Sequence, residues 1–207
     1  MKTFLFQGDS ITDAGRSRDN DDTYGLGYPT LFAADYLCRE PQALRFYNRA
    51  VSGDRSVDLY ARIKRDAINL KPDYMSVLIG VNDVWHEIGS QNGVCAEKYE
   101  RVCEMFYTEV QEAVPGITIF VLEPFVLKGA ATEAAWDVFR PEVEKRAVSA
   151  KRLADKLDLV FVPLQAKLDE VSAATGTAYW LCDGVHPAPA GHALIKNALA
   201  EAFEANR

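Results

Sequence analysis

Residues 3–10 read TFLFQGDS, an apolar run that stops at a glycine and leaves a serine just beyond it. A short run that is apolar at every position is typical of a strand buried on both faces, as in a parallel sheet. We therefore expect a strand over Thr3–Gln7, with the hydroxyl of Ser10 placed where that strand ends.

Four more short apolar runs alternate with stretches that have helical periodicity. The further strands are expected over Leu44–Asn48, Tyr74–Ile79, Ile117–Leu122 and Leu159–Val162. Apolar residues recur with helical spacing over 57–70, 102–113 and 143–157. A last helix is expected from Pro189 through Ala200, because proline suits a first helical turn. This alternation predicts right-handed crossovers and a parallel sheet that is covered on both faces.

Two segments between these elements are harder to assign. The polar stretch from Ile11 to Gly27, with a charge cluster over Arg16–Asp22, is expected to be a surface loop beside the first strand. The segment Thr132–Arg140 is ambiguous, because Pro141 can either kink a helix that runs through it or begin a new one.

Composition limits the class of protein. A chain of 207 residues fits a single domain over 1–207, and its 48% hydrophobic and 26% charged residues are ordinary for a globular protein. The net charge of −7 and the lack of a basic stripe argue against a nucleic-acid partner. No apolar run reaches the ~18 residues of a membrane span, and the run after Met1 is too short for a signal peptide. We expect a cytoplasmic protein.

The four cysteines fit that location. Cys95 and Cys103 fall on one expected helix, about 12 Å apart, which is too far for a disulfide. Cys38 and Cys182 show no spacing typical of metal ligands. All four are therefore expected to be reduced and mostly buried.

Polar residues follow the ends of the expected strands, where open α/β sheets form their binding sites. Ser10 follows the first strand, Ser52-Gly53-Asp54 the second, and Gly80-Val81-Asn82-Asp83 the third. Asp183 and His186 follow the last strand. Because the carboxyl ends of parallel strands lie at one edge of a sheet, we expect these side chains to meet there.

The residue types in this set suit nucleophilic catalysis. A serine hydroxyl such as that of Ser10 is a poor nucleophile unless a neighbouring base removes its proton. His186 can be that base, and Asp183 can fix its tautomer and stabilise the imidazolium. Pro187 keeps His186 out of a helical conformation, so the pair is expected on an extended loop.

An oxyanion formed by such an attack needs fixed hydrogen-bond donors. The backbone N–H groups of Ser10 and Gly53 and the side-chain amide of Asn82 can supply three. Gly53 has no Cβ, so a ligand can approach its backbone closely.

The sequence blocks around these residues resemble those of the SGNH (GDSL-type) hydrolases, in order and in spacing, over almost the whole chain. The blocks are Gly8–Ile11, Asn48–Gly53, Gly80–Asp83 and Asp183–His186. The resemblance implies a flavodoxin-like three-layer α/β/α sandwich with a five-stranded parallel sheet. It implies that the family's functional residues are Ser10, Gly53, Asn82 and His186. Two departures, Ile11 for the usual leucine and Ala50 where glycine is common, affect only local turn geometry.

Finer features are similar to the small intracellular acetylxylan esterases of that family. They are the segments Gly80–Trp85, Glu123–Phe125 and Asp183–Pro187. Those enzymes remove acetyl groups from xylo-oligosaccharides and form homo-oligomers. The resemblance therefore implies a small acetylated saccharide as substrate, no cofactor and a homo-oligomer. Trp85 and Trp180 can each either stack on a sugar ring or fill the core.

Other functions stay open at this point. The alternatives are a lipase-like or thioesterase activity on another short-chain ester, and a non-catalytic binding module on the same fold. A metal site built from Asp9, Asp183, His186 and His192 is disfavoured, because the sequence has no His-x-x-x-His pair. Asp9 is expected to secure the turn before the nucleophile and His192 to pack or cap a helix, while His86 is expected at the surface.

Overall fold

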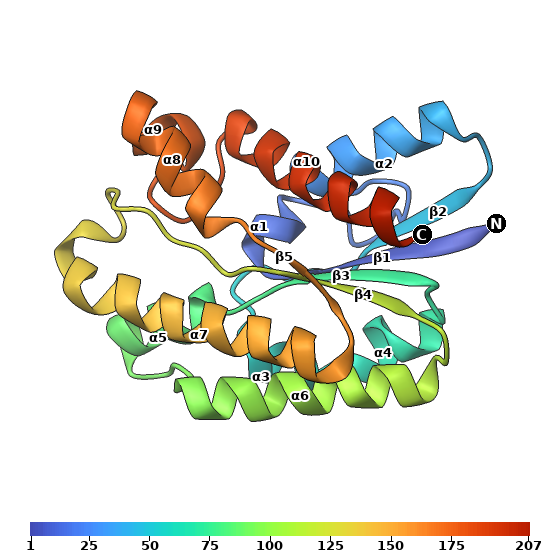
Figure 1. The fold of residues 1–207 in the computed structure, drawn as a ribbon, viewed down its shortest axis with the longest axis horizontal. Coiled ribbons are helices and arrows are strands. Elements are labelled where there is room, and N and C mark those ends of the chain that lie inside the picture. Colours follow the sequence, from blue (N-terminus) through green and yellow to red (C-terminus); the bar gives the residue numbers. More distant parts are fainter.

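A computed structural model describes residues 1–207 and shows a five-stranded sheet between two layers of helices (Figure 1). The strands are β1 (Lys2–Gly8), β2 (Leu44–Asn48), β3 (Tyr74–Leu78), β4 (Thr118–Leu122) and β5 (Val160–Val162). They are all parallel and lie in the order β2-β1-β3-β4-β5. The three-layer α/β/α sandwich expected from the sequence is confirmed, and β1 lies between β2 and β3, at the point where the strand order reverses.

The helices divide between the two faces of the sheet (Figure 1). One face carries α1 (Ser10–Asp13), α2 (Tyr28–Arg39), α8 (Gln165–Thr175), α9 (Thr177–Trp180) and α10 (Pro189–Asn206). The opposite face carries α3 (Ser56–Ala61), α4 (Ile63–Asp66), η1 (Ile68–Leu70), α5 (Val81–Ser90), α6 (Ala96–Ala113), η2 (Glu133–Ala135) and α7 (Trp136–Leu157). None of these helices combines the length and the apolarity that are needed to cross a bilayer.

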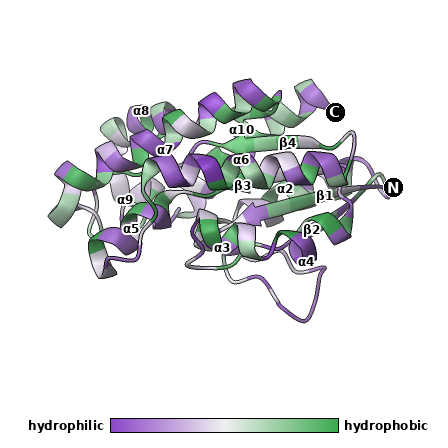
Figure 2. Cartoon of the chain, turned by 90° about the horizontal axis from the view of Figure 1, so that it is seen from below, coloured by the Kyte–Doolittle hydropathy of each residue, from purple (hydrophilic) through white to green (hydrophobic).

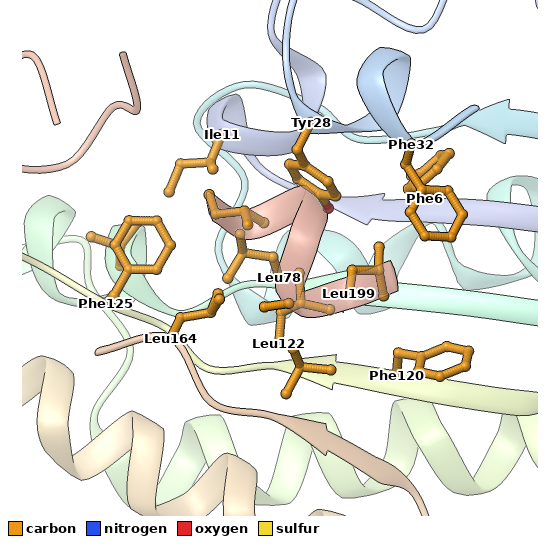
Figure 3. Close-up of a cluster of buried hydrophobic side chains, with 14 of the residues drawn as sticks. Phe6, Ile11, Tyr28, Phe32, Leu78, Phe120, Leu122, Phe125, Leu164 and Leu199 are labelled. Atoms are coloured by element: carbon orange, nitrogen blue, oxygen red, sulfur yellow. The ribbon is translucent and has the colours of Figure 1, made fainter. Parts of the chain in front are cut away.

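The apolar character of β1 follows from its position between two cores. Successive side chains of a strand point to opposite faces. Phe4 and Phe6 accordingly pack in the cluster under α2 and α10, where Phe6 lies beside Tyr28 and Phe32 (Figure 3). Leu5 instead joins the cluster under α3, α6 and α7. Apolar residues accordingly lie along the strands and the inner helix faces, and polar residues lie outside (Figure 2).

Residues 57–70 do not form the single helix that their periodicity predicts. The segment is α3, α4 and η1, with breaks at Arg62 and Ala67. The side-chain amide of Gln7, at the end of β1, donates to the carbonyl of Asp66 at 2.7 Å. That carbonyl would accept from the N–H of Leu70 in a continuous α-helix, and the N–H of Leu70 instead donates to Ala67.

The segment from Ile11 to Gly27 is also not surface loop throughout. It begins within α1, where Ile11 is buried in the core and Asp13 is buried among polar partners. The ambiguous segment before Pro141 ends in α7, which begins at Trp136 and continues through the proline. The proline removes only one helical hydrogen-bond donor there, which is tolerated close to a helix start.

The prediction that the cysteines are mostly buried is wrong. All four are free, but only Cys103, inside the core under α6, is buried. Cys38 on α2, Cys95 at the start of α6 and Cys182 in the loop after α9 are exposed. Their positions at element ends and on an outer helix face explain the difference.

Candidate active site

Ser10 stands at the turn between β1 and α1. The side-chain carboxyl of Asp9 caps α1 by accepting from the N–H of Ile11 at 3.0 Å, as expected for a residue that secures this turn. Gly8 must be a glycine, since a Cβ there would come within 2.4 Å of the Leu78 carbonyl. Ser10 is the first residue of α1, so its N–H has no partner within the helix.

Asp183 and His186 lie on a tight loop between α9 and α10. The loop is closed by a backbone bridge between Leu181 and Pro187. One carboxylate oxygen of Asp183 accepts from the backbone N–H groups of Val185 and His186, both at 2.8 Å. These backbone bonds hold the carboxylate in place independently of its contact with the imidazole.

The structure brings Ser10, His186 and Asp183 together in one chain of hydrogen bonds. The Oγ of Ser10 lies 2.9 Å from Nε2 of His186, although the residues are 176 positions apart. The Nδ1 of His186 lies 2.7 Å from the second carboxylate oxygen of Asp183. A proton on Nδ1 would donate to Asp183 and leave Nε2 free to accept the serine proton.

The charge state of Asp183 suits this arrangement. Burial acts to raise the pKa of Asp183, but the hydrogen bonds from the His186 ring, from the His186 N–H and from the Val185 N–H outweigh it. The pKa of this carboxyl therefore lies below its usual value, and it is ionised at neutral pH. An anion beside Nδ1 stabilises an imidazolium when one forms.

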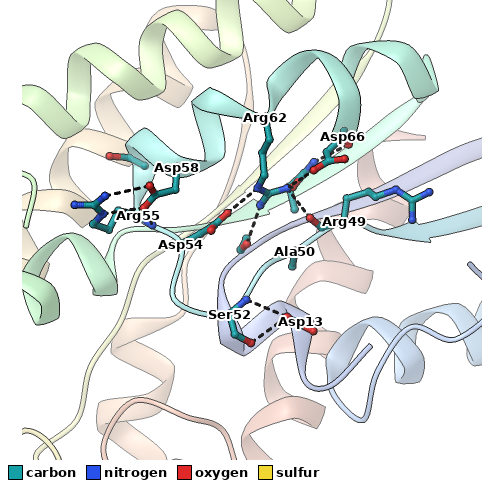
Figure 4. Close-up of polar contacts among 12 residues, drawn as sticks. Asp13, Arg49, Ala50, Ser52, Asp54, Arg55, Asp58, Arg62 and Asp66 are labelled. Carbon is teal, nitrogen blue, oxygen red and sulfur yellow. Dashed lines mark hydrogen bonds and ion pairs between the residues drawn. The ribbon is translucent and has the colours of Figure 1, made fainter. Parts of the chain in front are cut away.

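Gly53 lies in the loop that follows β2. Its φ is +86°, a conformation that favours glycine, and its backbone N–H has no acceptor in the protein. The loop is held against α1, because Ser52 donates to the Asp13 carboxylate from its N–H at 2.9 Å and from its hydroxyl at 3.0 Å (Figure 4). Gly53 is therefore fixed beside the helical turn that carries Ser10.

Asn82 comes from the first turn of α5, directly after β3. It is buried, and its Nδ2 donates to the carbonyl of Asp54 at 3.1 Å. An amide nitrogen has two hydrogens, so the second stays available to a ligand. The loop that carries Gly53 is thus hydrogen-bonded to both α1 and α5.

Asp9 and Asp83 are carboxyl groups buried beneath the site. Burial raises the pKa of Asp9 to about 7, and one of its oxygens has no partner. Burial also raises the pKa of Asp83 to about 6, although the N–H and hydroxyl of Ser56 donate to it. The protein interior therefore favours the neutral carboxyl at Asp9.

The two tryptophans differ in their relation to this site. Trp85 is half-buried, and its ring centroid lies 5.7 Å from that of His186 and 6.0 Å from that of Phe139. The ring of Trp180 packs beside Tyr179, and its indole N–H donates to Thr175 at 2.7 Å. Of the two indole rings, that of Trp85 packs against the ring of His186.

The other histidines have separate environments. The Nδ1 of His192 accepts from the N–H of Tyr28 at 3.2 Å and so caps α2, as expected from the sequence. Burial, and then the nearby charge of His186, lower the pKa of His192 to about 4. His86 is half-buried, and its ring makes no hydrogen bond. No cluster of three or more His, Cys, Asp or Glu side chains is arranged to hold a metal ion.

Two residues that support the site were not identified from the sequence. Asp13 was assigned to a surface loop, but it is buried and orders Ser52. Arg62 was placed within a regular helix, but it contacts the end of β1. The only sequence signal for Asp13 is its place three residues after Ser10, on the same face of a helical turn.

The fold and this hydrogen-bonded site define an α/β/α hydrolase. Comparison with known proteins then identifies the family to which the chain belongs. Residues 6–194 match the GDSL-like Lipase/Acylhydrolase family. An acetylxylan esterase from Geobacillus stearothermophilus is 32% identical over 203 residues, which cover 94% of this chain and 90% of that protein. The chain therefore belongs to the GDSL-like lipase/acylhydrolase family and is a carboxylic ester hydrolase.

Solved structures agree with this assignment. The chain superposes with a TM-score of 0.91 on a protein from Parabacteroides merdae described as a GDSL-like lipase, at 35% identity, covering 98% of this chain and 95% of that one. The crystal structure of acetylxylan esterase from Geobacillus stearothermophilus gives a TM-score of 0.87 at 30% identity, with coverage of 98% and 94%. The resemblance identified from the sequence is confirmed.

Proposed function

We propose that the chain removes O-acetyl groups from a small carbohydrate, such as an acetylated xylo-oligosaccharide, through an acyl-Ser10 intermediate. The observation that carries the proposal is the chain of contacts from Ser10 through His186 to Asp183, at 2.9 and 2.7 Å. This is the geometry that a serine nucleophile, its base and the residue that orients the base require.

In the first half of the reaction, the Oγ of Ser10 attacks the ester carbonyl while Nε2 of His186 takes its proton. The N–H groups of Ser10 and Gly53 and the amide of Asn82 donate to the oxyanion. Each such donor lowers a barrier of this kind by about 3 kcal/mol. The tetrahedral intermediate then breaks its bond to the alcohol, which leaves with the proton from His186.

In the second half, a water molecule attacks the acyl group on Ser10 and gives a proton to His186. The intermediate collapses, acetate leaves, and His186 returns the proton to Ser10. Asp183 keeps Nδ1 protonated through both halves and stabilises the transient imidazolium. No cofactor is required by this sequence of steps.

The choice of substrate is supported by the relatives and by Trp85. The matched proteins include enzymes named acetylxylan esterase. Trp85 presents a half-buried indole beside His186, where a ring can pack against the alcohol part of an ester. We propose Trp85 as a saccharide contact, and we propose Trp180, whose carbonyl accepts from Ala188 at 2.9 Å beside the loop of Asp183 and His186, as a second one.

Three measurements test the proposal. A fluorophosphonate probe should label the native protein and should not label Ser10→Ala; equal labelling of both would overturn the assignment of the nucleophile. A series of nitrophenyl esters from acetyl to decanoyl should show a sharp preference for acetyl. Preference for long chains would instead indicate a lipase-like enzyme. Release of acetate from acetylated xylo-oligosaccharides, compared with other acetylated saccharides, identifies the alcohol.

We also propose, from the sequence and the resemblance, a cytoplasmic location and assembly into homo-oligomers. Light scattering on the purified protein measures the assembly directly, and a mass equal to one chain of 23.0 kDa would refute it.

A further inference from the structure

Arg62 stands at the break between α3 and α4, and its side chain points back toward the end of β1 (Figure 4). Only 11% of this charged side chain is exposed. Burial of a guanidinium is costly unless its N–H groups are paired with well-placed acceptors. The acceptors of Arg62 therefore indicate what the side chain holds in place.

On one side, the guanidinium binds the end of β1. Its Nη2 donates to the carbonyl of Gly8 at 3.3 Å and its Nη1 to the side-chain oxygen of Gln7 at 2.9 Å. The same Gly8 carbonyl accepts from the N–H of Val51 at 3.1 Å. Gly8 precedes Ser10 by two residues, so these bonds fix the turn that carries the nucleophile.

On the other side, the guanidinium binds the loop that carries Gly53. Its Nη1 donates to the carbonyl of Arg49 at 2.6 Å and its Nε to the carboxylate of Asp54 at 2.6 Å. Asp54 directly follows Gly53, and its own carbonyl accepts from the amide of Asn82. One side chain is thus connected to all three oxyanion donors, through Asp54 to Gly53 and Asn82, and through the Gly8–Asp9 backbone to Ser10.

We propose that Arg62 is a positioning residue for the oxyanion hole, which sets the distance between the Ser10 turn and the Gly53 loop. The inference rests on the proposed function, because these donors matter only if an oxyanion forms. A guanidinium is planar and presents five N–H donors in fixed directions. A lysine ammonium keeps the charge but cannot bind both loops in that geometry.

Arg65 provides a matched control. It forms an ion pair with Asp66 at 2.8 Å, and Arg62 also contacts Asp66, at 3.3 Å. The Arg65 side chain is 78% exposed, however, and it contacts neither Gly8 nor Asp54. Arg65→Lys therefore disturbs the same carboxylate without loosening either loop.

The test compares Arg62→Lys with Arg65→Lys. We expect Arg62→Lys to lower kcat for nitrophenyl acetate by about 10- to 100-fold with KM nearly unchanged, since small displacements of catalytic groups cost that much. Fluorophosphonate labelling and inhibition by a boronic acid, which forms a tetrahedral anion on serine, should weaken by a similar factor. The shape of the pH–rate profile should stay the same, because Arg62 contacts neither His186 nor Asp183.

The inference is overturned if Arg62→Lys is folded and its kcat stays within about twofold of that of Arg65→Lys. If circular dichroism shows that Arg62→Lys does not fold, Asp54→Ala takes its place, since it frees the loop but leaves Asp66 beside the guanidinium. A native kcat in Asp54→Ala would also overturn the inference. Ser10→Ala distinguishes a failure of the proposed function from a failure of the role of Arg62. If Ser10→Ala is active, both the proposed function and the role of Arg62 are refuted. If Ser10→Ala is inactive and Arg62→Lys has native-like activity, only the role of Arg62 is refuted.

Discussion

Gly129 lies directly against the backbone of Asp183. A Cβ on Gly129 would come within 2.6 Å of the carbonyl carbon and oxygen of Asp183. The loop that follows β4 also donates two backbone hydrogen bonds to the same segment, from Leu127 to Gly184 and from Ala131 to Asp183, both at 2.9 Å. This loop is therefore the surface on which the Asp183–His186 loop rests.

Gly129→Ala should impair turnover by displacing that loop. Relief of a 2.6 Å contact requires a shift approaching 1 Å, and a shift of that size at a catalytic group can lower kcat by about 100-fold. Gly89→Ala is the matched control, because a Cβ on Gly89 meets nothing within 4 Å. Steady-state kinetics on both variants check the prediction, and a normal kcat in Gly129→Ala would show that the contact is unimportant.

Asp183→Asn should lower kcat far more than it disturbs the fold. The amide oxygen can still accept from the N–H groups of Val185 and His186, so the loop is preserved. The amide N–H₂ would face Nδ1 of His186 and force the proton onto Nε2, where it blocks transfer from Ser10. The corresponding change in a serine protease costs about 10⁴-fold in kcat. We expect a loss of similar order here, measured with nitrophenyl acetate; a loss below tenfold would contradict the proposed role.

Asp9→Asn should change how stability depends on pH. The pKa of Asp9 is about 7 in the folded protein, raised by burial, and near 3.8 in the unfolded chain. The folded state thus binds the proton more tightly, so the contribution of Asp9 to stability is fully present below pH 3.8 and is lost as pH rises through about 7. The loss is on the order of 4 kcal/mol for such a shift.

Urea denaturation at pH 5 and pH 8 measures this effect. Asp9→Asn should show a smaller decrease in the free energy of unfolding between the two values than the native protein shows. The amide keeps the acceptor for Ile11, and the contribution of Asp83 is common to both proteins. Equal decreases in the two proteins would mean that Asp9 is ionised throughout.

Strands that are buried on both faces can be predicted from the sequence. Helix boundaries that depend on residues far away in the chain cannot. β1, β3 and β4 are apolar on both sides, so their runs identify them, and the strand ends then place Ser10 and His186 at one edge. In residues 57–70, the break at Ala67 depends on Gln7, which lies on a strand far away in the sequence. α1 is a four-residue helix with a polar sequence, too short to show a periodicity.

Helix α2 was not expected either, although it has a sequence signal. Tyr28, Phe32 and Tyr36 recur with helical spacing, and Pro29 stands in the first turn. The sequence does not show how deeply a charged side chain is buried, as Asp13 and Arg62 illustrate.

His192→Gln should stabilise the protein at acid pH relative to the native chain. The pKa of His192 is lowered to about 4 by burial and by His186, against 6.5 for the ordinary side chain. The folded state therefore favours the neutral ring, and this contribution is present above pH 6.5 and is lost as pH falls toward 4. Because the ring is partly exposed, we expect a loss of only about 2 kcal/mol.

Glutamine can accept from the N–H of Tyr28 without titrating, so His192→Gln should keep the cap on α2 and lose the acid sensitivity. His192→Phe keeps an aromatic ring but removes the acceptor, and should cost about 1 kcal/mol at every pH. Denaturation of the three proteins at pH 7.5 and pH 5 separates the two effects. Turnover at pH 7.5 should change by less than about threefold in His192→Gln, since the ring bonds Tyr28 rather than Ser10. A loss of turnover as large as that of Ser10→Ala would instead place His192 in the catalytic machinery.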